Sequence, residues 1–99
     1  MERYETVNMA SGGVALVLEP SANWEEFARY ASVWADKLNA KRRADPIISV
    51  DECLLEVQID GGQFWITYDD YQSAIHLEPK DGKYNDIVYT LQRRLRGDA

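Results

Sequence analysis

The sequence has very little of the residues that most enzyme and metal sites need. It contains one cysteine, Cys53, and one histidine, His76. A single cysteine cannot form an internal disulfide, and these two residues cannot supply the four clustered ligands of a structural zinc site. The chain also lacks Gly-x-Ser-x-Gly, Walker, dinucleotide-binding and His-Glu-x-x-His patterns. We therefore expect no metal, no cofactor and no enzyme of these classes.

Long hydrophobic runs and an excess of positive charge are absent as well. A mean hydropathy of -0.45 with 28% charged residues leaves no membrane span. Eleven Lys and Arg against seventeen Asp and Glu give a net charge of -6, which argues against unassisted binding to nucleic-acid phosphates. The first residues lack the basic-then-apolar pattern of a secretion signal. With the single cysteine, these absences predict a soluble cytoplasmic protein.

The length and the apolar content are those of one globular domain. The chain has 99 residues, of which 45% are hydrophobic, so it is long enough for one core and too short for two. We expect a single domain over residues 1–99, with residues 1–12 as a candidate flexible lead-in.

The first half of the sequence predicts a strand followed by a helix. The run 14–18 is apolar on both strand faces, which is typical of an interior strand. Asn23 and Glu26 have the spacing of a capping box, so a helix is expected to begin at Trp24. Apolar residues then recur with a period of 3.6 residues, and we expect the whole face that they form to be buried: Trp24, Phe27, Ala28, Ala31, Trp34, Ala35 and Leu38.

The centre of the sequence predicts a three-stranded meander. Residues 54–60 and 63–68 flank Gly61-Gly62, a hairpin signal. A second turn at residues 69–72 leads to a third strand. Pairing Asp60 with Gln63, and Asp69 with Gln72, gives the meander one apolar side: Leu55, Val57, Ile59, Phe64, Ile66, Tyr68, Ile75 and Leu77.

The C-terminal part completes the predicted fold with a second helix. Apolar residues recur at helical spacing between Tyr84 and Leu95, and Gly97 supplies a stop. Ile47-Ile48 is expected to form a short extended piece. The β-α-β-β-β-α order predicts an α+β two-layer sandwich, in which two helices pack on a mainly antiparallel sheet.

The polar side of the meander is the predicted partner-binding surface. A tryptophan at the centre of an exposed sheet is typical of a protein contact, although another element could instead cover it as core. We interpret His76 as a satisfied surface residue rather than a pH switch. The proposed surface consists of Glu56, Gln58, Trp65, Thr67 and His76.

Two catalytic arrangements are alternatives to this binding surface. Cys53 and His76 are expected on opposite faces of the sheet, so a nucleophilic dyad is disfavoured and Cys53 is interpreted as a small buried hydrophobe. Asp60 and Glu78 flank Gln63 on the polar side and have the chemistry of an acid-base pair. A small enzyme that uses these carboxylates therefore remains an alternative.

Adjacent charges along the chain have simpler explanations than a site. Asp51-Glu52 and Asp69-Asp70 lack the spacing of a calcium loop, and turn formation explains Asp69-Asp70. Lys41-Arg42-Arg43 and the arginines at positions 93, 94 and 96 follow helix ends, where they complement the helix dipole. Their convergence into an anion-binding patch is the alternative.

Two resemblances to known proteins add little about function. Residues 23–97 resemble double-stranded RNA-binding domains in topology, but Gly61-Gly62 and the mixed-charge segment 80–86 stand where those domains carry their RNA-binding residues. The runs 64–71 and 75–79 resemble small uncharacterised bacterial proteins of about this length. Neither resemblance implies catalytic residues.

The sequence therefore predicts a non-enzymatic protein-binding or inhibitor module. Its acidity suits the neutralisation of a basic protein, such as a secreted nuclease toxin, as small bacterial immunity proteins do. The alternatives are the carboxylate enzyme and a homodimer that forms through Trp65.

Overall fold

The computed structural model describes residues 3–97 and has an α+β fold, as predicted. Seven strands form one antiparallel sheet in the order β1-β2-β7-β6-β5-β3, and β4 pairs with β5 outside this path. The helices and strands are β1 (Thr6–Asn8), β2 (Val14–Glu19), η1 (Trp24–Glu26), α1 (Phe27–Lys37), β3 (Lys41–Arg42), β4 (Ile47–Ile48), β5 (Cys53–Ile59), β6 (Gly62–Asp69), β7 (Ala74–Pro79), η2 (Gly82–Tyr84) and α2 (Asn85–Leu95).

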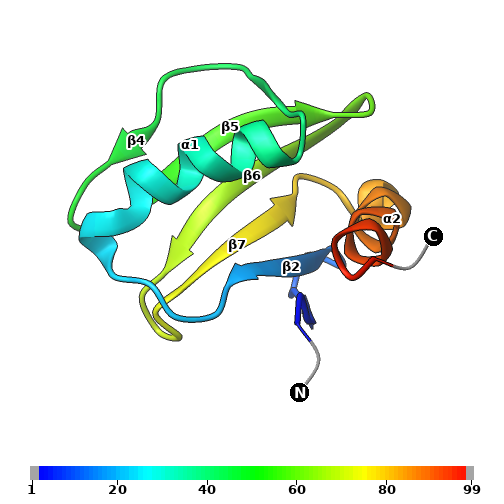
Figure 1. Ribbon diagram of the computed structural model, residues 1–99, viewed down its shortest axis with the longest axis horizontal. Helices are drawn as coiled ribbons and strands as arrows, with labels where there is room; N and C mark the ends of the chain where they lie inside the picture. Colours follow the sequence, from blue (N-terminus) through cyan, green and yellow to red (C-terminus); the bar gives the residue numbers. More distant parts are fainter. Residues whose placement is uncertain (1–2, 98–99) are drawn as a thin grey trace.

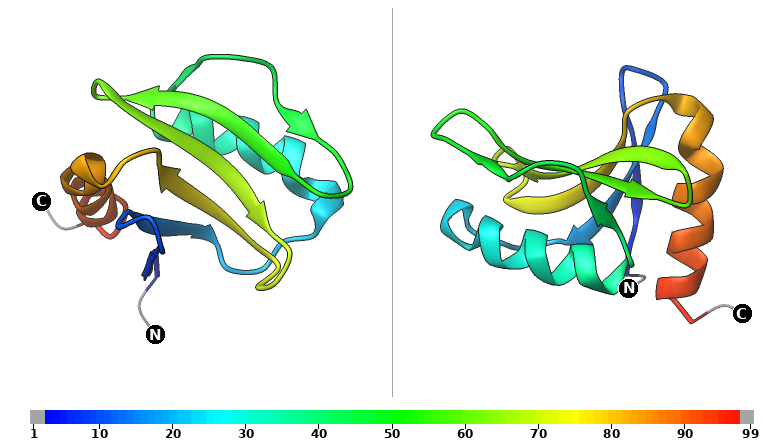
Figure 2. Two further views of the ribbon diagram at one scale, coloured as in Figure 1. Left: turned by 180° about the vertical axis from the view of Figure 1, so that it is seen from behind. Right: turned by 90° about the horizontal axis from the view of Figure 1, so that it is seen from above.

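The two helices share one hydrophobic core with the sheet. α1 lies along one side of the sheet (Figure 1), and α2 stands at one end, against β2, with its C-terminal half at the level of α1 (Figure 2). Phe27 and Trp34 of α1 and Val88 and Leu91 of α2 belong to the same buried cluster. Within residues 3–97, no helix lies along the opposite side of the sheet.

The β5–β6 turn lies one residue earlier than predicted, which shifts the pairing register of the two strands by two residues. Ile59 pairs with Gly62, so the turn consists of Asp60 and Gly61 rather than Gly61 and Gly62. Both turn residues have positive φ, 50° and 80°, as a type I′ turn requires, and Asp-Gly is a favoured pair for that turn. Gly62 instead lies inside β6, where an added Cβ would come within 2.7 Å of the Ile87 side chain of α2.

The β6–β7 turn is longer than predicted. Asp69 pairs with Ala74, which leaves four residues in the turn. The Asp69 carboxylate accepts the backbone N–H of Tyr71 at 2.9 Å, and Ser73 has a φ of 52°. Each register differs by two residues, an even number, so every side chain keeps its predicted face. The predicted apolar side is buried, except for Tyr68, which is half-buried.

The first segments confirm the interior strand and correct two details. β2 pairs with both β1 and β7 and is therefore interior. Residues 6–8, expected in a lead-in, form β1. Glu26 accepts the N–H of Asn23 at 3.0 Å, as predicted. Trp24, however, lies in η1 rather than in the α-helix and is 41% exposed, and Ala28, also expected on the buried face, is exposed. The 3-10 turn changes the rotation per residue, so the buried stripe of α1 does not extend back to Trp24.

Candidate functional site

The predicted partner-binding residues lie on one face of the sheet, but most of them interact with other residues of the chain, such as Lys80 and Glu78. Glu56, Trp65 and Glu78 stand side by side on β5, β6 and β7. Lys80 forms an ion pair with Glu56, and its Nζ lies 5.0 Å from the centroid of the Trp65 ring. Trp65 is half-buried. Its ring is covered by Lys80 of the same chain, not by a helix.

His76 is the clearest correction on this face. Its side chain is only 4% exposed, between Val17 and Thr67 on the neighbouring strands, so it is not a surface residue. Thr67 donates to the Glu78 carboxylate at 2.9 Å instead of to the imidazole. The Nε2 atom of His76 is buried without a hydrogen-bond partner among residues 3–97. Such a buried, unpaired polar atom lowers stability.

Replacement of His76 by leucine is therefore expected to stabilise the protein. Leucine has a similar volume and no polar atom, so His76→Leu removes the desolvation cost and should raise the free energy of unfolding by about 1 kcal/mol. Urea denaturation of both proteins at pH 8 measures the difference. A decrease of similar size in the free energy of unfolding would contradict this expectation and show that Nε2 has a partner, such as an ordered water.

The residues of the catalytic alternatives are not brought together. Cys53 is buried among core side chains, on the opposite side of the sheet from His76, as predicted. Gln63 pairs with Gln58 rather than with Asp60. Asp60 lies in the exposed turn, whereas Glu78 is opposite Trp65, which is three residues, or roughly 10 Å, along the strand from Gly62.

The two basic clusters lie in different parts of the fold. The guanidinium of Arg42 binds back to α1, at 3.3 Å from the Asp36 carboxylate and 3.1 Å from the carbonyl of Ser32. β3, which contains Arg42, is at the β5 edge of the sheet, whereas α2 packs against β2.

Among residues 3–97, no helix is long and apolar enough to cross a membrane.

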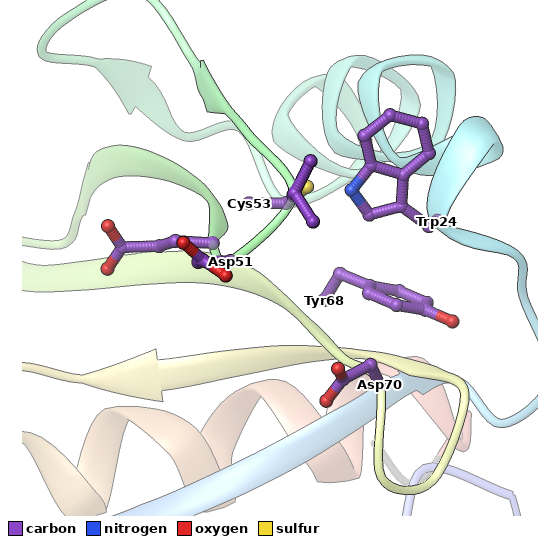
Figure 3. Close-up of a pocket in the computed structure, with 7 residues that line it drawn as sticks. Trp24, Asp51, Cys53, Tyr68 and Asp70 are labelled. Atoms are coloured by element: carbon purple, nitrogen blue, oxygen red, sulfur yellow. The ribbon is translucent and has the colours of Figure 1, made fainter.

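A pocket that the sequence analysis did not predict lies at the β4 end of the molecule. Its volume is about 350 Å³. Three segments that are distant in sequence form it: η1, the loop between β4 and β5, and the end of β6 with the turn that follows. We call it the Trp24 pocket, and it is lined by Trp24, Val50, Asp51, Glu52, Cys53, Tyr68 and Asp70. In Figure 3 the Tyr68 ring lies below the Trp24 ring, and the Asp51 and Asp70 carboxylates lie away from the Trp24 ring.

Local hydrogen bonds hold the pocket walls in place. The Trp24 indole donates its Nε1–H to the carbonyl of Ser49 at 2.9 Å. Ser49 and Glu52 close a tight turn, in which the N–H of Ser49 donates to the Glu52 carbonyl at 2.8 Å and the N–H of Glu52 donates to the Ser49 hydroxyl at 3.1 Å. These bonds connect η1 to the loop that carries Val50 and Asp51. The indole nitrogen is satisfied by Ser49, so Trp24 contributes apolar, aromatic surface to the pocket lining.

The pocket lining is acidic and has no counter-charge of its own. Asp51, Glu52 and Asp70 contribute three carboxylates, and no basic residue lines the pocket. The ion pairs among residues 3–97 use other carboxylates, those of Glu26, Asp36 and Glu56.

Exposed apolar side chains gather around the same pocket. Figure 1 shows β4, the start of α1 and the β6–β7 turn at one end of the molecule. Of the seven large apolar side chains exposed among residues 3–97, five belong to η1, β4, the loop after β4 and the β6–β7 turn: Trp24, Ile47, Ile48, Val50 and Tyr71. This apolar surface surrounded by acidic groups is more exposed than the face around Trp65.

The sequence contained a partial signal for this site. From the sequence, turn formation explains Asp69-Asp70, Asp51-Glu52 is only excluded as a calcium loop, and Trp24 is expected on a buried helix face. The two acidic pairs and the apolar residues near them are present in the sequence. Their proximity in space, however, depends on turns that bring three segments together.

Comparison with known protein families, with curated proteins and with solved structures gave no match.

Proposed function

We propose that this protein is a non-enzymatic binding module that captures a basic protein partner with the Trp24 pocket and the apolar surface around it. The observation that carries the proposal is an exposed, aromatic pocket with three carboxylates and no counter-charge in its lining. In this proposal the module works in the cytoplasm and blocks its partner, as an inhibitor of the immunity type does.

Physical chemistry supports a protein partner for such a surface. Protein interfaces combine an apolar, aromatic centre with a polar rim, and tryptophan is enriched among the residues that dominate binding energy. The net charge of -6 favours the approach of a positively charged partner and opposes that of an acidic one. The Trp24 pocket therefore replaces the face around Trp65 as our proposed contact.

A defined cationic peptide tests the proposal. The probe is a labelled, capped dodecapeptide of alternating leucine and arginine, and its binding is followed by fluorescence anisotropy. Neutralising two pocket carboxylates, in Asp51→Asn/Asp70→Asn, should raise the dissociation constant at least fivefold, because it removes the local counter-charge. Higher salt should weaken binding of the wild-type protein, since salt screens exposed charges.

The matched control changes the net charge equally at the other end of the fold. Asp60→Asn/Asp86→Asn alters the β5–β6 turn and the start of α2, and it should change the dissociation constant less than twofold. Asparagine tolerates the positive φ of position 60. Equal weakening by both double variants would mean that only net charge matters, and it would overturn the proposed site.

A further inference from the structure

The other two tryptophans each have a cation and a carboxylate from their own chain. Lys80 lies over Trp65, at 5.0 Å from Nζ to the ring centroid, and is paired with Glu56. Lys37 lies over Trp34 at 4.8 Å. The Trp34 indole also donates to the Glu19 carboxylate at 2.8 Å. In both places an aromatic face, a lysine and an acidic residue form one group.

Trp24 has the ring and the carboxylates of such a group, without the cation. Five contacts between a cation and an aromatic ring occur among residues 3–97, and none involves Trp24: Arg3–Tyr4, Arg29–Tyr30, Lys37–Trp34, Lys80–Trp65 and Lys83–Tyr84. Trp24 is also the most exposed of the three tryptophans.

We propose that the Trp24 pocket binds one lysine or arginine side chain of the basic partner, with its cationic group at the Trp24 and Tyr68 rings. Asp51 and Asp70 supply the counter-charge. This inference rests on the proposed function and names the chemical group that the pocket recognises. The partner then completes the arrangement that Lys37 and Lys80 complete elsewhere in the chain.

The pocket's chemistry favours an organic cation over a metal ion. No three His, Cys, Asp or Glu side chains among residues 3–97 come together as metal ligands, so the carboxylates are spread around the pocket. A hard metal ion needs several converging oxygens. An ammonium or guanidinium group is instead attracted by aromatic faces and by carboxylates on its periphery. A volume of about 350 Å³ has room for a single long side chain.

Capped single amino acids test this recognition directly. The probes are the Nα-acetyl amides of arginine, lysine and citrulline, the last of which has nearly the shape of arginine without its charge. Each is titrated into ¹⁵N-labelled full-length protein, and the indole N–H of Trp24 and the backbone N–H groups of residues 50–52 and 70 are followed by NMR. We expect saturable shifts with arginine and lysine, and binding at least tenfold weaker with citrulline. The ratio of the arginine and lysine constants identifies the preferred cation.

Two variants separate ring recognition from general apolar contact. Trp24→Leu keeps an apolar side chain but has no aromatic face, and it should abolish the preference for arginine over citrulline. Tyr89→Leu removes an exposed aromatic ring of α2 that belongs neither to the pocket nor to the apolar surface around it. It should leave all three constants within twofold of the wild type.

The outcomes of the two experiments are distinguishable. If the cationic dodecapeptide depends on Asp51 and Asp70 while arginine, lysine and citrulline bind equally or not at all, the side-chain pocket is overturned and the proposed function stands. If binding of the dodecapeptide does not depend on these carboxylates, the proposed function is overturned together with the side-chain pocket. Retained selectivity in Trp24→Leu would overturn the role of the indole.

Discussion

Val57→Asp is expected to leave the protein unfolded under native conditions. Val57 has no exposed surface and lies opposite Phe64 in the middle of the buried side of the sheet. An aspartate there would place a charge in the core without a partner, at a cost of several kcal/mol against a typical total stability of about 5–15 kcal/mol. Far-UV circular dichroism and proton NMR dispersion would show the loss of the fold.

The same substitution at an exposed valine is the matched control. Val50 is 89% exposed in the loop before β5, so Val50→Asp should change the free energy of unfolding by no more than about 0.5 kcal/mol. Glu56, on the opposite face, is a poorer position for a control, because its substitution would remove the ion pair with Lys80. Similar damage from both valine variants would contradict the assignment of the buried face.

Trp34→Ala is expected to lower the free energy of unfolding by about 3–5 kcal/mol, the usual range for truncation of a buried aromatic. Trp34 is 2% exposed and is the largest of the fully buried side chains. Its ring meets Tyr4 edge to face, with the centroids 5.9 Å apart, so its loss leaves a cavity between α1 and the N-terminal segment. Urea denaturation, followed by circular dichroism, measures the change.

Trp24→Ala is the corresponding control, with the same atoms removed from an exposed position. It loses the hydrogen bond to Ser49 and little buried surface, so the expected cost is below about 1 kcal/mol. A cost as large as that of Trp34→Ala would show that Trp24 is a core residue and would weaken its assignment to a binding pocket. The expected small cost would make variants of Trp24 usable in binding experiments.

The sequence predicted the faces of the meander well, because side-chain direction in a strand depends only on whether a position is odd or even. Each predicted pairing register was wrong by two residues, which preserves this alternation. The choice between Asp60-Gly61 and Gly61-Gly62 depends on how closely β6 approaches α2. That approach involves Ile87, 25 positions after Gly62, and no local pattern encodes it.

The shortest strands and the pocket were harder to predict for a related reason. β1 and β3 have three and two residues, too few for a periodic signal, and they are strands only because β2 and β5 offer them partners. Ile47–Ile48 was predicted because both residues favour extended backbone. The Trp24 pocket likewise depends on the relative placement of three segments rather than on any motif within one of them.

The position of β2 has a consequence for the route by which the chain folds. β5, β6 and β7 follow one another through short turns, so their pairing closes small loops. Leu16 of β2, in contrast, pairs with Leu77 of β7, although more than half of the chain lies between them. Closing that long loop costs more entropy, and pairing between distant segments slows folding. We therefore expect the meander of β5, β6 and β7 to form early, and we expect the pairing of β2 with β7 to limit the folding rate.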